Sequence, residues 1–212
     1  MLTRTILAAL AVCALAGCGT SYGLPANGFF NDTIARAFIP LEGRTLLIRE
    51  NRASAFVIAP GIAVTNAHTE NFLDSVSVIG KSRFYDLLFF RTDKNVQVSM
   101  AAPWAGERVF AYGEGSRGEL RMAAGVIRTL NAPVEPRCQS CPVQAAFTFD
   151  AVAGPGFSGG PVIDATTGQL VGITFGFTDS DDGKSRLMYA YPMSRVRNEL
   201  ATIQGRVPTD VN

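Results

Sequence analysis

The first indication of the fold is a glycine-rich stretch, Ala153-Gly154-Pro155-Gly156-Phe157-Ser158-Gly159-Gly160-Pro161-Val162. Four glycines and two prolines in ten residues predict a backbone that turns sharply, because glycine tolerates the positive φ angles that such a turn needs. A loop of this kind can aim successive backbone N–H groups at one small concavity, where they would hold the negative oxygen of a tetrahedral intermediate beside the Ser158 hydroxyl. The same pattern also fits a tight hairpin with an incidental serine. The stretch alone therefore leaves two interpretations, a nucleophile loop and a structural turn.

Two residues upstream could complete a catalytic group with Ser158. His68 is the single histidine of the chain and follows an apolar, strand-like run that begins at Phe56. A lone histidine is often structural, but the end of a strand that faces a cleft is also where a general base would lie. Asp86 precedes the apolar residues 87–90, where an unpaired carboxylate would be costly to bury. A hydrogen bond from the imidazole would satisfy this carboxylate and orient the histidine toward the serine.

The order of these residues separates two kinds of hydrolase. The run Gly156-Phe157-Ser158-Gly159-Gly160 also fits the G-x-S-x-G nucleophile elbow of α/β-hydrolases, in which the acid and then the histidine follow the serine. In this chain no histidine follows Ser158. The order His68, Asp86, Ser158 is that of the trypsin-like proteases.

The motifs around these residues resemble those of the trypsin-like serine peptidases, especially the bacterial periplasmic branch that includes the high-temperature-requirement type. Thr65-Asn66-Ala67-His68 resembles the T-x-A-H motif of that family, and Asp86-Leu87-Leu88 resembles its D-L-A motif. The run 156–161 resembles G-[DN]-S-G-G-P. The resemblance extends from about Arg44 to about Leu200.

This resemblance implies an all-β, chymotrypsin-like fold of two barrels, with the active site in the cleft between them. It also implies acyl-transfer chemistry, in which His68 takes the proton of Ser158 and Asp86 holds the imidazole. The N–H groups of Gly156 and Ser158 would bind the oxyanion. By position in the family, the floor of the substrate pocket would be Val152 and its wall would be formed by Phe175, Gly176 and Phe177. None of these residues is charged, so we expect a small or medium apolar side chain before the cleaved bond.

Two departures from the family pattern are informative. Phe157 stands where the family has Asp or Asn, which excludes activation through a salt bridge to a newly cleaved N-terminus. The interval from His68 to Asp86 is short, whereas the family usually places several strands there. We therefore expect a trimmed first barrel.

Short apolar segments separated by turn residues predict strands along most of the chain, with a turn at Pro60-Gly61. In the first barrel, about 34–95, we expect strands at about 44–50, 53–59, 61–65, 75–80 and 84–91. A linker would follow, and the second barrel, about 105–192, would have strands at about 107–112, 119–130, 143–149, 160–163, 169–176 and 187–191. One helix is expected over about 193–204. Residues 34–212 would thus form one peptidase domain.

The N-terminus has the layout of an export signal. Arg4 precedes an apolar run that is too short to span a bilayer comfortably, and Leu15-Ala16-Gly17-Cys18 resembles a bacterial lipobox. We expect residues 1–17 to be removed and Cys18 to carry lipid, with ordinary secretion and cleavage nearby as the alternative. Residues 18–33 would then be a tether that anchors the protein in a bacterial cell envelope, facing the periplasm or the exterior.

The remaining composition excludes several partners and cofactors. Loss of Arg4 leaves eighteen basic and eighteen acidic residues, scattered along the chain, so no nucleic-acid partner is indicated. Cys138 and Cys141 are the cysteine pair left after Cys13 and Cys18 are assigned to the signal and the lipid. A local disulfide is favoured over redox chemistry or zinc, because zinc would need further Cys or His ligands. No metal and no cofactor are expected.

The sequence therefore predicts a serine endopeptidase that cleaves protein substrates through an acyl-enzyme. The alternative from another class is a catalytically silent lipoprotein that uses the same two barrels to bind a protein partner. A third possibility, an esterase, would use the same triad but prefer esters to proteins.

Overall fold

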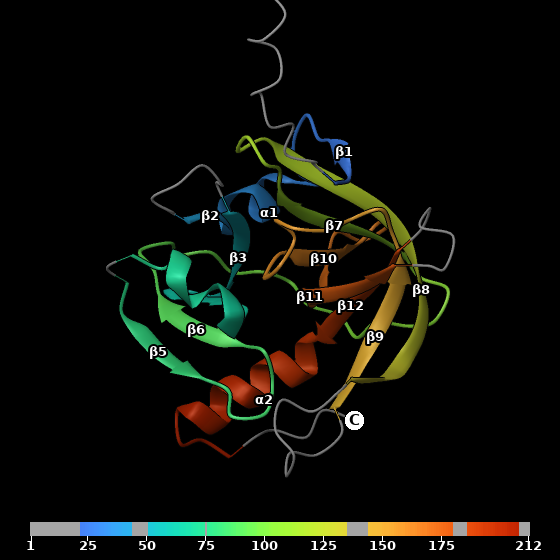
Figure 1. The fold of residues 1–212 in the computed structure, drawn as a ribbon. Helices are drawn as coiled ribbons and strands as arrows, with labels where there is room; N and C mark the ends of the chain where they lie inside the picture. The colour runs from blue at the N-terminus through green and yellow to red at the C-terminus, as the bar shows by residue number, and fades with distance from the viewer. Residues whose placement is uncertain (1–21, 44–50, 75, 135–143, 180–185, 208–212) are drawn as a thin grey trace, which may run out of the picture.

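The computed structural model describes residues 22–43, 51–74, 76–134, 144–179 and 186–207. Two antiparallel sheets lie side by side, with the N-terminal sheet on the left of Figure 1 and the second, larger one on the right. The C-terminal helix α2 (Met193–Ile203) runs beneath them. This arrangement confirms the predicted all-β, two-barrel fold with one C-terminal helix.

The first sheet has five strands in the order β2-β3-β4-β6-β5. Their bounds are Phe38–Gly43 for β2, Asn51–Ala59 for β3, Ile62–Thr65 for β4, Val78–Lys81 for β5 and Leu88–Arg91 for β6. The predicted β3–β4 hairpin is confirmed, and Gly61 in its turn has a φ of 75°. β3 is buried over residues 53–58, where residues on both of its faces pack in the first core, and the strand also contacts β7 of the second barrel. It therefore lies where the two barrels meet.

The second sheet closes into a barrel of six strands in the order β8-β7-β10-β11-β12-β9, with β9 pairing back to β8. The bounds are Arg108–Glu114 for β7, Leu120–Val134 for β8, Gln144–Asp150 for β9, Pro161–Asp164 for β10, Leu170–Asp179 for β11 and Arg186–Pro192 for β12. Its core contains the fully buried rings of Phe147, Phe149 and Phe157. Phe157 belongs to the nucleophile loop, which is therefore anchored in this core.

Four elements were not predicted. They are the strands β1 (Leu24–Pro25) and β2, the helix α1 (Asp32–Ala37) and the 3-10 helix η1 (Ala67–Phe72). α1 begins where the Asn31 side chain accepts a hydrogen bond from the Ile34 N–H at 2.9 Å, which is a standard N-cap. The apolar face of α1 buries Ile34 and Ala37 in the first core.

The region predicted as a tether, residues 18–33, differs from that expectation over its described part. From Tyr22 onward the chain lies against the second barrel, because β1 pairs with β8 and the Ala26 N–H donates to the Leu120 carbonyl at 3.0 Å. The Phe29 ring packs 5.1 Å from that of Phe38. Backbone pairing and aromatic packing thus make residues 22–33 part of the folded domain. Glycine and asparagine content alone did not reveal these contacts.

The strand expected at 84–91 begins only at Leu88. Before it, the Ser82 hydroxyl accepts hydrogen bonds from the N–H groups of Phe84 at 3.2 Å and Tyr85 at 2.9 Å. These bonds hold a bend, since they satisfy N–H groups that a strand would have directed to a neighbour. Asp86 therefore lies in a bend beside β6.

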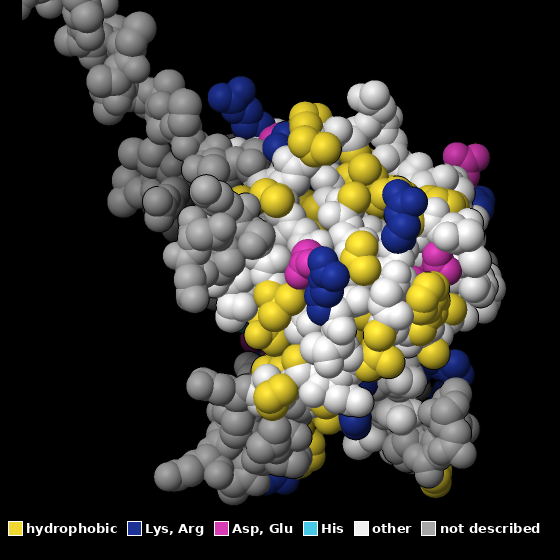
Figure 2. Space-filling view, turned by 90° about the vertical axis from the view of Figure 1, so that its right-hand side faces the viewer, with side chains coloured by type: hydrophobic (Ala, Val, Ile, Leu, Met, Phe, Trp, Pro, Cys, Tyr) yellow, Lys and Arg dark blue, Asp and Glu magenta, His cyan; other side chains and the backbone are white. Residues whose placement is uncertain are grey.

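Three other expectations lie outside the described residues: the strand at 44–50, the lipidated Cys18 and the disulfide between Cys138 and Cys141. Within the described part of the chain, none of the helices combines the length and apolarity needed to cross a membrane. On the face shown in Figure 2, basic, acidic and hydrophobic side chains are interspersed.

Candidate active site

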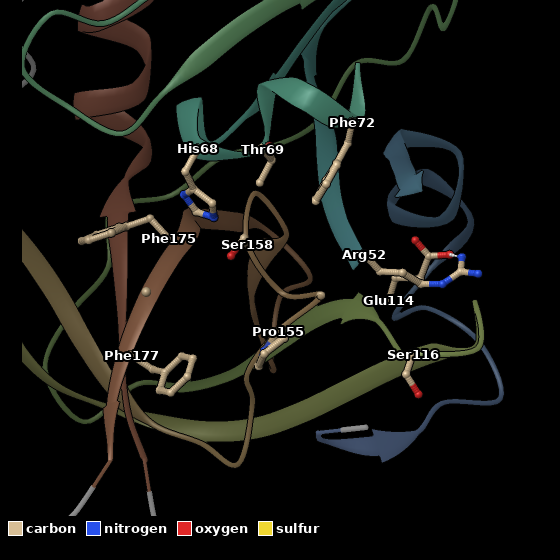
Figure 3. A pocket seen from close by; sticks show the side chains of 12 residues that line it. Arg52, His68, Thr69, Phe72, Glu114, Ser116, Pro155, Ser158, Phe175 and Phe177 are labelled. Carbon is tan, nitrogen blue, oxygen red and sulfur yellow. Dashed lines mark hydrogen bonds and ion pairs between the residues drawn. The ribbon is translucent and has the colours of Figure 1, made fainter. Parts of the chain in front are cut away.

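The first barrel presents His68 at the start of η1, directly after β4. The turn into η1 is fixed by hydroxyl groups: Thr65 Oγ1 donates to the Ser54 carbonyl at 2.8 Å, and Thr69 Oγ1 donates to the Asn66 carbonyl at 2.8 Å. Both threonines are buried, whereas the His68 side chain is 49% exposed. The local sequence thus directs the imidazole out of the barrel and into the pocket shown in Figure 3.

Asp86 is held against His68 by both of its carboxylate oxygens. Oδ1 accepts the backbone N–H of His68 at 3.0 Å, and Oδ2 lies 2.5 Å from the imidazole Nδ1. The Asp86 backbone is fixed as well, because its N–H donates to the Tyr191 hydroxyl at 3.2 Å and its carbonyl accepts from Asn66 Nδ2 at 2.9 Å. A carboxylate at Nδ1 favours the tautomer with the proton on that nitrogen, which leaves Nε2 able to accept a proton from the pocket side.

The nucleophile loop is clamped by three different strands. The Ser54 N–H and hydroxyl, from β3, donate to the carbonyls of Ser158 and Gly156, each at 2.8 Å. The Glu114 N–H, from β7, donates to the Gly156 carbonyl at 3.1 Å, and the Gly159 N–H donates to the Thr174 carbonyl of β11 at 2.9 Å. The loop therefore takes its position from both barrels at once.

Two of the loop glycines are required by conformation and by space. Gly156 has a φ of 95°, and a Cβ atom there would overlap the Glu114 carbonyl. Gly159 has a φ of 78°, and a Cβ atom there would collide with the Ser54 carbonyl. Among the described residues, no acceptor receives a hydrogen bond from the N–H of Gly156 or of Ser158. Two backbone donors beside the serine hydroxyl thus remain for a ligand.

His68 and Ser158 line the same pocket, a cavity of about 490 Å³ between the barrels. In Figure 3 the His68 ring lies next to Ser158, with Phe175 and Phe177 on one side of the pocket and Arg52 and Glu114 on the other. The full lining consists of Arg52, His68, Thr69, Phe72, Glu114, Ser116, Pro155, Gly156, Ser158, Phe175, Gly176 and Phe177.

Of the predicted pocket residues, Phe175, Gly176 and Phe177 line this cavity and Val152 does not. The flanking Ala151 and Ala153 are buried, whereas Val152 lies in a bend between them and is 57% exposed. The structure therefore does not place Val152 at the pocket floor.

Phe175 is joined to Asp86 through Tyr191. The Phe175 and Tyr191 rings are stacked 4.0 Å apart at an interplanar angle of 11°, and the Tyr191 hydroxyl accepts the Asp86 N–H. The Tyr85 ring meets Tyr191 edge-on at 5.4 Å. One buried tyrosine thus supports both the acid of the candidate triad and the pocket wall.

A buried ion pair on the other side of the pocket was not predicted. Arg52 Nη1 lies 2.6 Å from Glu114 Oε1 and also 2.6 Å from Oε1 of the exposed Glu42. The other Glu114 oxygen, Oε2, is buried without a hydrogen-bond partner. Burial raises the pKa of the Glu114 carboxyl, although the nearby Arg52 opposes this. No sequence motif signalled this pair, because Glu114 follows an ordinary strand pattern and its partner is sixty-two positions away.

No group of three or more His, Cys, Asp or Glu side chains in the described residues is arranged to hold a metal ion. The arrangement that the structure does provide is an imidazole backed by a carboxylate, a serine hydroxyl in the same cavity, and backbone N–H groups beside that hydroxyl. Such a set can carry out nucleophilic acyl transfer.

Residues 70–173 match the family described as the trypsin-like peptidase domain. The chain carries a trypsin-like peptidase domain. The match contains Asp86 and Ser158 and begins just after His68. Among curated proteins, the trypsin-like domain is similar to Protease Do-like 1, chloroplastic, of Arabidopsis thaliana, at 28% identity over 145 residues. That alignment covers 65% of this chain but only 32% of the plant protein, so the chain spans about a third of its relative.

Solved structures show the same fold. The Rv3671c protease of M. tuberculosis in its active form superposes with a TM-score of 0.67 at 19% identity, covering 88% of this chain and 90% of that one. The MamO protease domain of Magnetospirillum magneticum gives 0.62 at 19% identity, covering 78% and 96%. The HtrA-type protease AlgW with a tripeptide gives 0.65 at 21% identity, covering 82% and 63%. At these identities the likeness supports the trypsin-like fold alone.

Proposed function

We propose that this protein is a serine endopeptidase that cleaves protein substrates through an acyl-enzyme, with His68, Asp86 and Ser158 as its triad. The observation that carries the proposal is the contact between His68 and Asp86 at the edge of the pocket that also contains Ser158. The family match and the clamped nucleophile loop support it.

In the proposed reaction, Ser158 Oγ attacks the peptide carbonyl while its proton passes to His68 Nε2. The carbonyl oxygen becomes an oxyanion that accepts hydrogen bonds from the N–H groups of Gly156 and Ser158. The C–N bond then breaks, and the imidazolium returns its proton to the leaving amine. Water repeats the sequence on the ester, so the acid product and the free serine are restored. Asp86 keeps its charge throughout and stabilises the imidazolium.

In the structure, no hydrogen bond joins the side chains of His68 and Ser158, both of which are described residues. Rotation about the Cα–Cβ bond of Ser158 moves the hydroxyl within the pocket without moving the clamped backbone. Catalytic hydrogen bonds often tighten only when the substrate is bound. We therefore expect the hydrogen bond from the Ser158 hydroxyl to His68 Nε2 to form when the substrate binds.

The proposed substrate is a protein or peptide. Support comes from the pocket, which is open between the barrels, and from the structural likeness to an HtrA-type protease that has been seen with a tripeptide. We also propose the location that the N-terminal sequence indicates, a lipid anchor at Cys18 that holds the protein in a bacterial cell envelope.

Labelling with a fluorophosphonate tests the catalytic proposal, because this probe reacts with an activated serine. Wild-type protein should be labelled at Ser158, and Ser158→Ala should remove the label while leaving the fold intact. Ser116→Ala is the matched control, since Ser116 lines the same cavity but lies outside the triad. Folded wild-type protein that takes no label would contradict the proposal and favour the silent, partner-binding alternative. Faster turnover of simple esters than of any protein would instead favour an esterase.

A further inference from the structure

The nucleophile loop has a second support, on the side away from the pocket. Phe157, the residue before the proposed nucleophile, is completely buried. Its ring lies against two glycines: a Cβ atom on Gly113 would be 2.6 Å from Phe157 Cγ, and one on Gly23 would be 2.9 Å from Phe157 Cζ. Gly113 belongs to β7, but Gly23 belongs to the segment that was predicted as a tether. The N-terminal chain therefore covers the outer end of the Phe157 ring.

The segment 22–25 is attached mainly through its backbone. Arg121 donates from Nε to the Tyr22 carbonyl at 2.9 Å and from Nη2 to the Gly23 carbonyl at 2.6 Å. Leu24 is paired in register with Met122 of β8, yet its side chain points outward and the residue is 69% exposed. Gly23 has a φ of 72°, a conformation that favours glycine and brings the backbone close to Phe157. This geometry fixes the segment against the barrel without burying Leu24.

Tyr22 reaches the loop from the same segment. A Cβ atom on Gly154 would lie 2.6 Å from Tyr22 Cδ2, so the tyrosine ring rests directly on the loop backbone. The Arg186 guanidinium lies between two rings, with its Cζ 3.9 Å from the Tyr22 centroid and 4.1 Å from the Phe177 centroid. Arg186 Nη1 also donates to the Ala153 carbonyl at 2.8 Å.

These contacts form one continuous set of packed groups. Tyr22 covers Arg186, Arg186 holds the first carbonyl of the loop and supports Phe177, and Phe177 lines the pocket. Gly23, meanwhile, presses on Phe157 one residue before Ser158. Two neighbouring residues of the N-terminal segment therefore contact the nucleophile loop at two places, near its start and at the residue before Ser158.

We infer that Tyr22, Gly23 and Arg186 are positioning residues that hold the nucleophile loop in its reactive conformation. The inference rests on the proposed function for its catalytic meaning. Because Phe157 stands where the family has Asp or Asn, this position has no carboxylate that could form a salt bridge. The loop is supported instead by the packing of the Phe157 ring against the backbone of the N-terminal segment. Because displacing a catalytic loop by a fraction of an ångström slows acylation more than it weakens substrate binding, loss of this support lowers kcat.

The test measures kcat and KM on a peptide substrate, together with the rate of fluorophosphonate labelling. Tyr22→Ala should lower kcat and the labelling rate by about ten-fold, the scale expected for loss of one cation–π contact. Arg186→Ala should lower both by at least as much, because it removes two cation–π contacts and the hydrogen bond to the Ala153 carbonyl. Tyr22→Phe keeps the ring over Arg186 and should stay close to the wild-type rate. Leu24→Ala is the matched control, because it changes the same segment at an exposed side chain.

Rates are compared at a temperature where circular dichroism shows every variant to be folded. Wild-type kcat in both Tyr22→Ala and Arg186→Ala would overturn the inference. So would an equal loss in Leu24→Ala, since the effect would then belong to the strand and not to these contacts.

Hydrogen exchange supplies a readout that does not require activity. The N–H groups of Phe157 and Gly160 donate within the loop, to the Gly154 carbonyl at 3.0 Å and the Phe157 carbonyl at 2.9 Å. Tyr22→Ala should speed exchange at these two amides and leave those of β4 unchanged. Unchanged loop exchange would overturn the inference even in a protein that proved to be silent. Unlabelled wild type with faster loop exchange in the variant would reject the proposed function and keep the inference.

Discussion

Asp86 contacts His68 twice, through the side chain of the histidine and through its backbone. Oδ2 lies 2.5 Å from Nδ1 and Oδ1 accepts the backbone N–H at 3.0 Å, so the carboxylate sets both the orientation of the ring and the position of the chain that carries it. The Asp86 side chain is 17% exposed, which limits competition from water for these bonds. This pairing shows that Asp86, and not the exposed Asp74 closer to His68 in the sequence, is the carboxylate that contacts the imidazole.

Asp86→Asn should lower turnover by about 10³ to 10⁴-fold, the scale known for this change in a trypsin-like triad. An amide in place of the carboxylate can present its N–H₂ group to Nδ1 and so favour the wrong imidazole tautomer. The measurement is kcat on an unfolded protein substrate, with the fold of the variant checked because a buried amide also affects stability. Asp74→Asn is the control, since Asp74 is exposed and should tolerate the change. If Asp74→Asn were the impaired variant and Asp86→Asn kept near wild-type turnover, the assignment of the acid would be wrong.

The substrate side chain before the cleaved bond should be small or medium and apolar. Phe175 and Phe177 line one side of the cavity and carry no charge, whereas the charged Arg52 and Glu114 lie on the other side (Figure 3). Cleavage of a peptide library should therefore favour residues such as Ala, Val or Leu at that position. Strong selectivity for Arg or Lys would contradict this prediction. Val152→Ala should leave the selectivity unchanged, because Val152 points to solvent outside the cavity.

The sequence predicted the fold class and brought forward the residues that meet in the pocket. Ser158 and His68 each lie in a short motif and line the same pocket, and in the Ser158 motif the glycines are required locally, as the positive φ angles of Gly156 and Gly159 show. For the strands, apolar runs between turn residues were sufficient, and the predicted and observed ranges of β3 and β11 overlap over most of their lengths.

What the sequence did not reveal depends on contacts between distant residues. Arg121 holds the carbonyl of Tyr22 across ninety-nine positions, and this is why a segment rich in small residues is folded and not a tether. Val152 lies outside the cavity lining for a related reason, since a position counted back from the serine does not say on which side of the loop the side chain emerges. In the same way, the partnership of Arg52 and Glu114 exists only once β3 and β7 have met.

Cys18→Ser should leave the protein without lipid and detached from membranes. The expectation follows from Leu15-Ala16-Gly17-Cys18 after a short apolar run, because the thiol of the cysteine is the acceptor of the lipid in such a signal. Incorporation of labelled palmitate in bacterial cells provides the measurement, and sedimentation with membranes gives a second one. Cys13→Ser is the matched control, since Cys13 lies inside the predicted signal and should not affect lipidation. Palmitate that persists in Cys18→Ser would mean that the lipobox interpretation is wrong.

Glu114 should make the folded protein less stable as the pH rises. Burial raises the pKa of its carboxyl above the usual 4.5, despite the attraction of Arg52, so the folded state binds this proton more tightly than the unfolded chain does. The stabilising contribution is therefore complete below pH 4.5 and is lost as the pH increases through the raised value. One group of this kind changes the free energy of unfolding by at most about 1.4 kcal/mol per pH unit.

Denaturant unfolding of wild type and Glu114→Gln, at a series of pH values from about 4.5 to 7, isolates this contribution, because all other titrating groups are common to both proteins. Wild type should lose stability relative to the glutamine variant over that interval. The altered contact with Arg52 adds a cost to the variant that is the same at every pH, so it does not affect this trend. Glu42→Gln is the control for changing a partner of Arg52, because the Glu42 side chain contacts the same guanidinium but is 68% exposed. Two outcomes would contradict the prediction. Parallel curves for wild type and Glu114→Gln would show that the attraction to Arg52 balances the cost of burying the carboxylate. A gain in wild-type stability relative to Glu114→Gln as the pH rises would show that the ion pair outweighs that cost.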